Sequence, residues 1–219
     1  MSSFLALSRK NYINIVSLIS ALLMLSFFVS GCSALIYQVS WQRALYVLIG
    51  VDIDSITIIV SIFMLGIGLG GALGGWISDS FPRHRILFYA GIEFAIATYG
   101  ALSLGLVHQL ELFMNTNLLN ASSGGGAVAC VLFLTIPTIL MGMTLPLLTM
   151  AFNERYANIG VSIGRLYFTN TLGAAVGAAM VPFVLLPALT LPQVIWVAVT
   201  GNIGAVVLAL LAKNLSRRI

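Results

Sequence analysis

Residues 28–41 read FVSGCSALIYQVSW and allow two different interpretations of the chain around them. Val29 to Cys32 has the form of a bacterial lipobox, at which the cysteine is lipidated and the chain before it is removed. A lipoprotein signal should be followed by a polar tether, but apolar and aromatic residues follow Cys32. Tyr37 and Trp41 instead suit the outer interface of a membrane, where amphipathic rings collect. We therefore expect a membrane helix here, and lipidation of Cys32 stays open as the alternative.

The composition of the chain indicates that its natural solvent is lipid. Of the 219 residues, 60% are hydrophobic and only 7% are charged, and the mean hydropathy is +1.07. A soluble domain carries about a quarter charged residues, and a globule of this size cannot bury so much apolar surface. The net charge of +4 is better explained by orientation in a membrane than by binding of nucleic acid. We expect the lipid bilayer, and no nucleic acid, among the partners.

Six segments are long and apolar enough to cross a bilayer. A helix needs about 20 apolar residues to cross a hydrocarbon layer of roughly 30 Å. The connections between the segments are short, and no polar stretch is long enough to form a second domain. The sequence therefore predicts an all-α membrane protein with one domain over 1–219. Its six transmembrane helices are expected at about 13–38, 54–77, 86–107, 127–151, 162–187 and 193–212.

The basic residues predict how these helices are oriented. Six crossings place both chain ends on the same side of the membrane. If that side is the cytoplasm, nine of the ten Lys and Arg residues lie inside and only Arg43 lies outside. This distribution follows the positive-inside rule. We therefore expect both termini in the cytoplasm.

Glycines recur every four residues in the second and fifth predicted helices. Gly66, Gly70 and Gly74 share one face of the second helix, and Gly173 and Gly177 share one face of the fifth. Such faces form flat grooves against which another membrane helix packs closely. We expect both faces to make contacts within the chain. If they faced lipid, a dimer interface would be the better interpretation.

The turn after the second predicted helix carries charged residues in a distinctive order. Its sequence, GGWISDSFPRHR (74–85), resembles the loop motif of the major facilitator superfamily, with Asp79, Arg83 and Arg85 at the matching positions. In that superfamily the motif fastens two helices together at the cytoplasmic face. Pro82 stands in place of the usual turn glycine, and an ordinary basic inner loop is an equal alternative. Six helices are half of a twelve-helix transporter of this type, so the resemblance implies two inverted three-helix repeats.

Glu93 is the ionisable residue that lies clearly inside a predicted helix. It follows Arg85 by eight residues and is therefore about 12 Å into the layer, where a charge costs about 2.5–3.5 kcal/mol. We expect it to face the bundle interior near Asn170, with Thr171 at a similar depth and Tyr89 one turn away. Two interpretations stay open, namely a site for a cation or a polyamine and a buried structural hydrogen bond.

Four stretches together resemble the membrane domain of the bacterial spermidine synthase-like family. They are SGCSALIYQVSWQR (30–43), FMLGIGLGGALGG (63–75), PTILMGMTLPLL (137–148) and GRLYFTNTLGAAVGA (164–178), and they cover nearly the whole chain in order. The resemblance implies a transporter-like membrane half, a bacterial inner membrane and an attached synthase-like domain. The sequence departs from the family at Gln38, where an acid is frequent. It also holds no Rossmann-like unit for an aminopropyl or methyl donor.

The residues form no catalytic constellation, so we expect no catalytic residue, no metal and no cofactor in this chain. The first function class is a non-catalytic membrane subunit that anchors or assembles with a partner at the cytoplasmic face. Any aminopropyl or methyl transfer would then need a separate soluble synthase-like partner. The second class is a small transporter of a cation or polyamine that acts as a dimer of six-span halves. The third is a structural accessory subunit of a larger membrane complex. We expect the chain to form a homo-oligomer, or a hetero-complex with a membrane or cytoplasmic protein.

Overall fold

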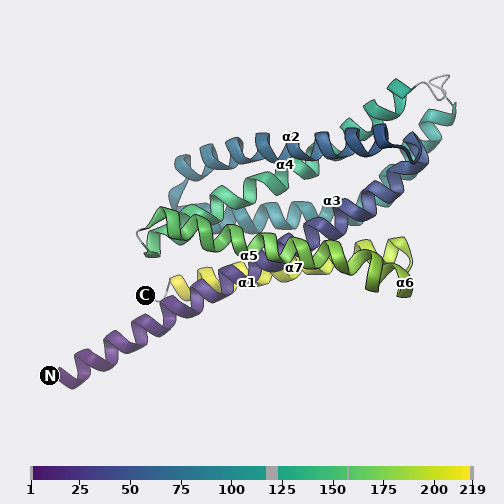
Figure 1. Cartoon of the computed structure of the whole chain (residues 1–219). Coiled ribbons are helices and arrows are strands. Elements are labelled where there is room, and N and C mark those ends of the chain that lie inside the picture. Colours follow the sequence, from purple (N-terminus) through teal and green to yellow (C-terminus); the bar gives the residue numbers. More distant parts are fainter. Residues whose placement is uncertain (1, 117–122, 157, 218–219) are drawn as a thin grey trace.

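The computed structural model describes residues 2–116, 123–156 and 158–217, and this part of the chain contains helices and no strands (Figure 1). The long helices are α1 (Ser2–Ile49), α2 (Ile53–Ser80), α3 (Arg85–Thr116), α4 (Ser123–Tyr156), α5 (Ile159–Met180) and α7 (Leu191–Ser216). The short ones are η1 (Pro82–His84), η2 (Val181–Leu185) and α6 (Leu186–Ala188). The all-helical class predicted from the sequence is confirmed for the described residues.

Within the described residues, six helical segments are long and apolar enough to cross a membrane. They cover Asn14–Tyr46, Ile53–Ser80, Pro82–Leu112, Gly125–Asn153, Ile159–Ala188 and Leu191–Ser216. The first predicted segment was too short, because α1 continues without a break beyond Gln38 to Ile49. The fifth segment passes from α5 through a single π-helical turn at Pro182 into α6. Such turns form where proline removes a backbone donor from the helical ladder.

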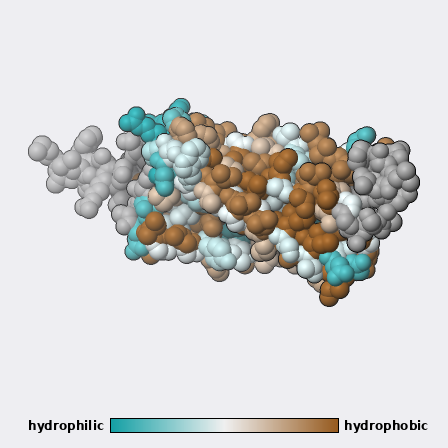
Figure 2. Space-filling model, turned by 90° about the horizontal axis from the view of Figure 1, so that it is seen from above, coloured by the Kyte–Doolittle hydropathy of each residue, from teal (hydrophilic) through white to brown (hydrophobic). Residues whose placement is uncertain are grey.

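The long helices run alternately in opposite directions along the bundle (Figure 1). The beginning of α1 and the end of α7 lie at one end, together with the α2–α3 turn, the end of α4 and the beginning of α5. This end carries Arg83, Arg85, Lys213 and Arg217, and we call it the basic end. Figure 2 shows apolar residues over the middle of one face and hydrophilic residues toward both ends. A bundle that crosses a hydrocarbon layer is expected to have this distribution.

The six long helices pack in a regular pattern. The most extensive contacts join α1 to α5 and α7, α4 to α2 and α3, and α3 to α7. These contacts come in corresponding pairs. The contact of α1 with α5 corresponds to that of α4 with α2, and the contact of α1 with α7 corresponds to that of α4 with α3. In this correspondence α1, α2 and α3 match α4, α5 and α7, respectively. The first and fourth long helices therefore have equivalent places in the bundle.

Both glycine faces lie against other helices of the same chain. A Cβ atom added at Gly70 or Gly74 would overlap the backbone of α4 at Ile139 or Met143, and one at Gly66 would overlap Thr138. Added at Gly173 or Gly177, it would overlap the α1 carbonyl of Phe28 or Cys32. Only glycine allows backbones to approach this closely. The same chain therefore provides the partner helix for each face.

The turn between α1 and α2 combines a special backbone position with a helix cap. Gly50 has a φ of +83°, a left-handed conformation that glycine adopts without strain. Asp52 then caps α2, because its Oδ1 accepts a hydrogen bond of 2.7 Å from the backbone N–H of Ser55. Hydrogen bonds from the Ser55 side chain and backbone lower the pKa of Asp52. The cap therefore stabilises the turn at neutral pH and loses this effect as the pH falls through the lowered pKa.

Two aromatic residues lie in the core and not on the surface of the bundle. Tyr37 and Trp41 are fully buried, and their rings stack with centroids 4.8 Å apart. The Trp41 ring packs edge-on against Tyr99 and Phe133 at 5.8 and 5.7 Å. The predicted position of these rings at the outer interface was wrong, because the first helix was predicted to end near residue 38 and α1 continues to Ile49. In the longer α1 they face α3 and α4 inside the bundle.

Candidate functional site

The carboxylate of Glu93 is fully buried where α1, α3 and α7 meet. Ser30 on α1 donates a hydrogen bond of 2.5 Å from its Oγ to Oε1 of Glu93. Asn202 on α7 donates one of 2.5 Å from its Nδ2 to Oε2. Both carboxylate oxygens are therefore hydrogen-bonded, each by a different helix. A carboxylate at this depth is otherwise costly, and these bonds explain how the bundle retains it.

A second set of hydrogen bonds lies one helical turn away. Ser26 donates to the carbonyl oxygen of Ala205 at 2.8 Å. Because this uses the single hydroxyl proton of Ser26, the 3.0 Å contact between Ser26 Oγ and Tyr89 Oη must have Tyr89 as its donor. Tyr89 is also fully buried. We call the combined set of Ser26, Ser30, Tyr89, Glu93, Asn202 and the Ala205 carbonyl the Glu93 network.

The register of three helices produces the two layers of this network. Along α1 the step from Ser26 to Ser30 is four residues, and along α3 the step from Tyr89 to Glu93 is the same. Residues four apart lie on one helix face. Because α7 runs in the opposite direction, its contribution moves backward from Ala205 to Asn202. Each layer therefore takes one group from each helix.

Two buried polar atoms near the network have no hydrogen-bond partner among the described residues. They are Oδ1 of Asn202 and the hydroxyl of Tyr37. Buried polar atoms in native proteins usually have a partner, and a bound water often provides it. Asn202 Oδ1 is an acceptor beside the carboxylate of Glu93. The network therefore contains one acceptor for which no donor is found among the described residues.

The predicted neighbour of Glu93 was wrong. Asn170 lies on α5 and packs against Gly31 of α1, where an added Cβ atom would overlap the Asn170 carbonyl. Thr171 is exposed on the outer side of α5. Ser30 and Gly31 are adjacent in sequence but point about 100° apart around the helix. Similar depth in the membrane therefore did not identify the helix that Glu93 faces.

The charged turn at the basic end contains one buried and two exposed positions of the predicted motif. Asp79 and Arg83 are exposed. Arg85 is buried, and its Nε donates a hydrogen bond of 2.9 Å to the carbonyl oxygen of Ser78 in the last turn of α2. This bond connects the end of α2 to the start of α3. Arg85 is therefore the motif residue that fastens these two helices.

The sequence reasoning missed Ser30 and Asn202 as partners of Glu93. Asn202 stands alone as an amide within VIWVAVTGNIGAVVLALL (194–211), and a buried amide in such a helix needs a partner. Polar residues also recur along one face of α1, at Ser26, Ser30, Ser33, Tyr37 and Ser40. Spacings of three and four residues mark a single helix face. These two patterns could have identified the surfaces that enclose Glu93.

In the part of the chain that the structure describes, these observations define an all-helical bundle with six helices apolar enough to cross a membrane. No protein-family model and no solved structure matches the sequence.

Three curated relatives are polyamine aminopropyltransferases. The one from Oceanobacillus iheyensis is 26% identical over 159 residues, which are 73% of this chain and 29% of that protein. Polyamine aminopropyltransferase 2 of Streptomyces coelicolor is 29% identical over 195 residues, or 87% of this chain and 33% of that protein. Polyamine aminopropyltransferase 2 of Ralstonia nicotianae is 24% identical over 172 residues, which are 78% of this chain and 32% of that protein. The chain thus spans about a third of the length of the curated relatives it matches.

Proposed function

We propose that this chain forms an integral membrane bundle that anchors an aminopropyl-transferring protein or domain at the cytoplasmic face. One observation carries the proposal. The similarity to polyamine aminopropyltransferases covers 73% to 87% of this chain but only 29% to 33% of those proteins. The six helical segments apolar enough to cross a membrane make up most of the described residues of this chain. In this proposal the bundle holds the enzyme at the membrane, and the catalytic groups lie outside these 219 residues.

The proposed architecture is half of a major facilitator-like bundle, made of two inverted three-helix repeats. The symmetric packing of the long helices supports it. The glycine faces add a sequence repeat, since LGGALGG (69–75) on α2 corresponds to LGAAVGA (172–178) on α5. The partner helices α4 and α1 correspond as well. Gly142 of α4 lies against the backbone of α2 in the same way as Gly31 of α1 lies against the backbone of α5. Inverted repeats of this kind are common in transporter folds.

The proposed docking side for the enzyme is the basic end of the bundle. Positive residues are retained on the cytoplasmic side of membrane proteins, and this end carries Arg83, Arg85, Lys213 and Arg217. Both described chain ends also lie here (Figure 1). An enzyme attached to the chain, or bound beside it, would therefore be in the compartment that holds its soluble substrates.

Purification in a mild detergent tests the anchoring proposal. The tagged chain is produced with and without a synthase-like protein encoded beside it or continuous with it, and the eluates are assayed for aminopropyl transfer to a diamine. We expect activity in the eluate only when the synthase-like protein is present. A soluble synthase that never elutes with the chain would contradict the proposal. Transfer by the 219 residues alone would also contradict it.

One observation favours a second function, the transport of a cation or polyamine by a dimer of such bundles. The free acceptor at Asn202 lies beside a buried carboxylate, and the two could together accept an ammonium group. Uptake of a labelled polyamine into liposomes that contain only the purified chain would support transport. If uptake is absent while the chain elutes with an active synthase, the anchoring function is favoured.

A further inference from the structure

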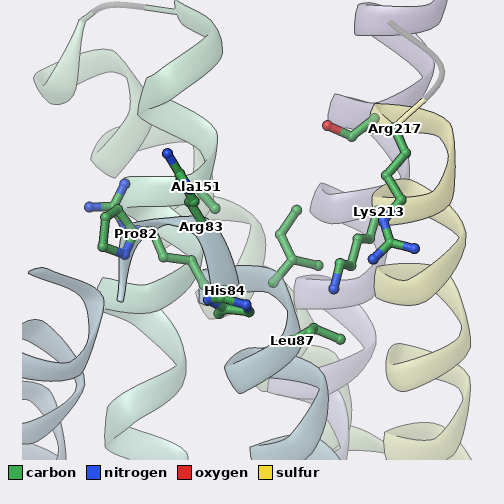
Figure 3. Close-up of a pocket in the computed structure, with 10 residues that line it drawn as sticks. Pro82, Arg83, His84, Leu87, Ala151, Lys213 and Arg217 are labelled. Atoms are coloured by element: carbon green, nitrogen blue, oxygen red, sulfur yellow. The ribbon is translucent and has the colours of Figure 1, made fainter. Parts of the chain in front are cut away.

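A pocket of about 370 Å³ opens at the basic end of the bundle (Figure 3). Arg83, His84 and Arg85 line it from the α2–α3 turn, and Lys213 and Arg217 line it from the end of α7. These two groups are far apart in the sequence, and the fold brings them to opposite sides of one pocket. Figure 3 shows the Lys213 and Arg217 side chains across the pocket from His84.

The electrostatics of this pocket favour an anion. The guanidinium groups of Arg83 and Arg217 and the ammonium group of Lys213 suit a phosphate, which accepts several charge-assisted hydrogen bonds at once. The turn η1 and α3 form one continuous helical segment that begins at Pro82 in the pocket lining, so the positive end of its helix dipole lies at the pocket. The end of α7 opposes this effect, because the last carbonyls of a helix carry partial negative charge. However, the backbone N–H of Arg217 bonds to the carbonyl of Lys213 at 3.3 Å and reduces that opposition.

An apolar groove continues from the basic pocket along α3. Its volume is about 530 Å³, and it shares His84 and Leu87 with the pocket. From there it extends past Gly91 to Ala95. At 1.5 Å per residue, the groove follows α3 for about 12 Å from Leu87 toward the middle of the bundle. A free phosphate would leave this groove empty, whereas an amphiphile would fill both parts.

We propose that this pocket and groove bind an anionic phospholipid, with its phosphate in the pocket and an acyl chain along α3. The proposal rests on the membrane-crossing part of the proposed function. The pocket lies at the ends of two segments apolar enough to cross the membrane. In a bundle that crosses the membrane, this is the level at which headgroups would meet the hydrocarbon. The bound lipid joins the α2–α3 turn to α7. It therefore orders the face on which the enzyme is proposed to dock.

Lipid titration of the purified chain in detergent tests this site. Apparent affinity is measured from the rise in melting temperature with phosphatidylglycerol, with phosphatidylcholine of the same acyl chains, and with glycerol phosphate. We expect phosphatidylglycerol to stabilise the chain and the other two to have little effect. Each Lys or Arg near a membrane surface contributes about a fivefold change in affinity. Arg83→Gln and Arg217→Gln should therefore each weaken phosphatidylglycerol binding about fivefold.

Matched variants separate this site from general charge effects. Arg43→Gln removes one positive charge from the opposite end and should leave the affinity unchanged. Gly91→Leu should fill the groove and weaken lipid binding without disturbing the fold, because nothing lies within 4 Å of an added Cβ atom. Gly105→Leu is its control on the same helix, at another position with open space.

Several outcomes would overturn the lipid site. Equal stabilisation by glycerol phosphate would indicate a free-anion site, and equal stabilisation by phosphatidylcholine would remove the role of charge. Loss of affinity in Arg43→Gln equal to that in Arg217→Gln would indicate non-specific attraction. If the chain is extracted only by detergent yet shows no preference for phosphatidylglycerol, the lipid site fails and membrane insertion stands. A chain found in the soluble fraction would contradict membrane insertion itself.

Discussion

Gly70→Leu is expected to destabilise the bundle by about 3 kcal/mol, at the upper end of the range for overpacked cores. An added Cβ atom at Gly70 would overlap the carbonyl oxygen of Ile139 and the backbone of Gly142 on α4. These are backbone atoms of a helix, so they cannot move aside as a flexible side chain does. The two helices would have to separate along their length, and α2 makes its main contacts with α4.

The measurement for this variant is the melting temperature of the purified chain in detergent. Gly68→Leu provides the matched control, because it makes the same substitution two residues earlier. Nothing lies within 4 Å of an added Cβ atom at Gly68, which is exposed on the other side of α2. We expect a large drop for Gly70→Leu and almost none for Gly68→Leu. Equal drops in the two variants would contradict the packing of the glycine face against α4.

Glu93→Leu is expected to cost about 2 kcal/mol, because it removes the acceptor of two buried hydrogen bonds. The hydroxyl of Ser30 and the amide of Asn202 would both be left without their partner. Glu93→Gln should cost much less. The introduced carbonyl can still accept from Ser30, and the introduced amide can donate to Asn202 Oδ1 after that side chain rotates. This acceptor is unpaired among the described residues, which makes the exchange possible.

The same pair of variants distinguishes a structural carboxylate from a cation site. If Glu93 is structural, Glu93→Gln keeps both the melting temperature and the activity of any associated enzyme, while Glu93→Leu lowers the melting temperature. If Glu93 binds a cation or polyamine, Glu93→Gln folds normally but loses uptake in liposomes. A Glu93→Gln variant as unstable as Glu93→Leu would contradict the hydrogen bonding of the Glu93 network.

The helices could be predicted from the sequence because length and apolarity alone decide whether a segment can cross a membrane. The burial of Glu93 was predictable for a similar reason, since a charge in hydrocarbon has few alternatives. Four-residue glycine spacing likewise predicted close helix packing. The repeat between residues 69–75 and 172–178 was also present in the sequence, although it became evident only when both faces were seen against their partner helices.

The partners of buried groups could not be predicted in the same way. Depth along a helix gives one coordinate, but the neighbour also depends on the direction around the helix and on which helices are adjacent. Asn170 matches Glu93 in approximate depth, yet it lies on α5, which packs on a different face of α1. The end of α1 was missed because polar Gln38 interrupts the apolar pattern, whereas the buried Tyr37 and Trp41 continue it.

The anchoring proposal and the lipid site both depend on a bundle that crosses the membrane with its basic end in the cytoplasm. Single cysteines at two turns test this most directly, in a chain that also carries Cys32→Ala and Cys130→Ala. Val51→Cys lies between α1 and α2, and Ser80→Cys lies at the end of α2, and both positions are exposed. A membrane-impermeant maleimide is expected to label Val51→Cys in intact cells and Ser80→Cys only after the membrane is opened. Labelling of Ser80→Cys in intact cells, or the same accessibility at both positions, would contradict this topology.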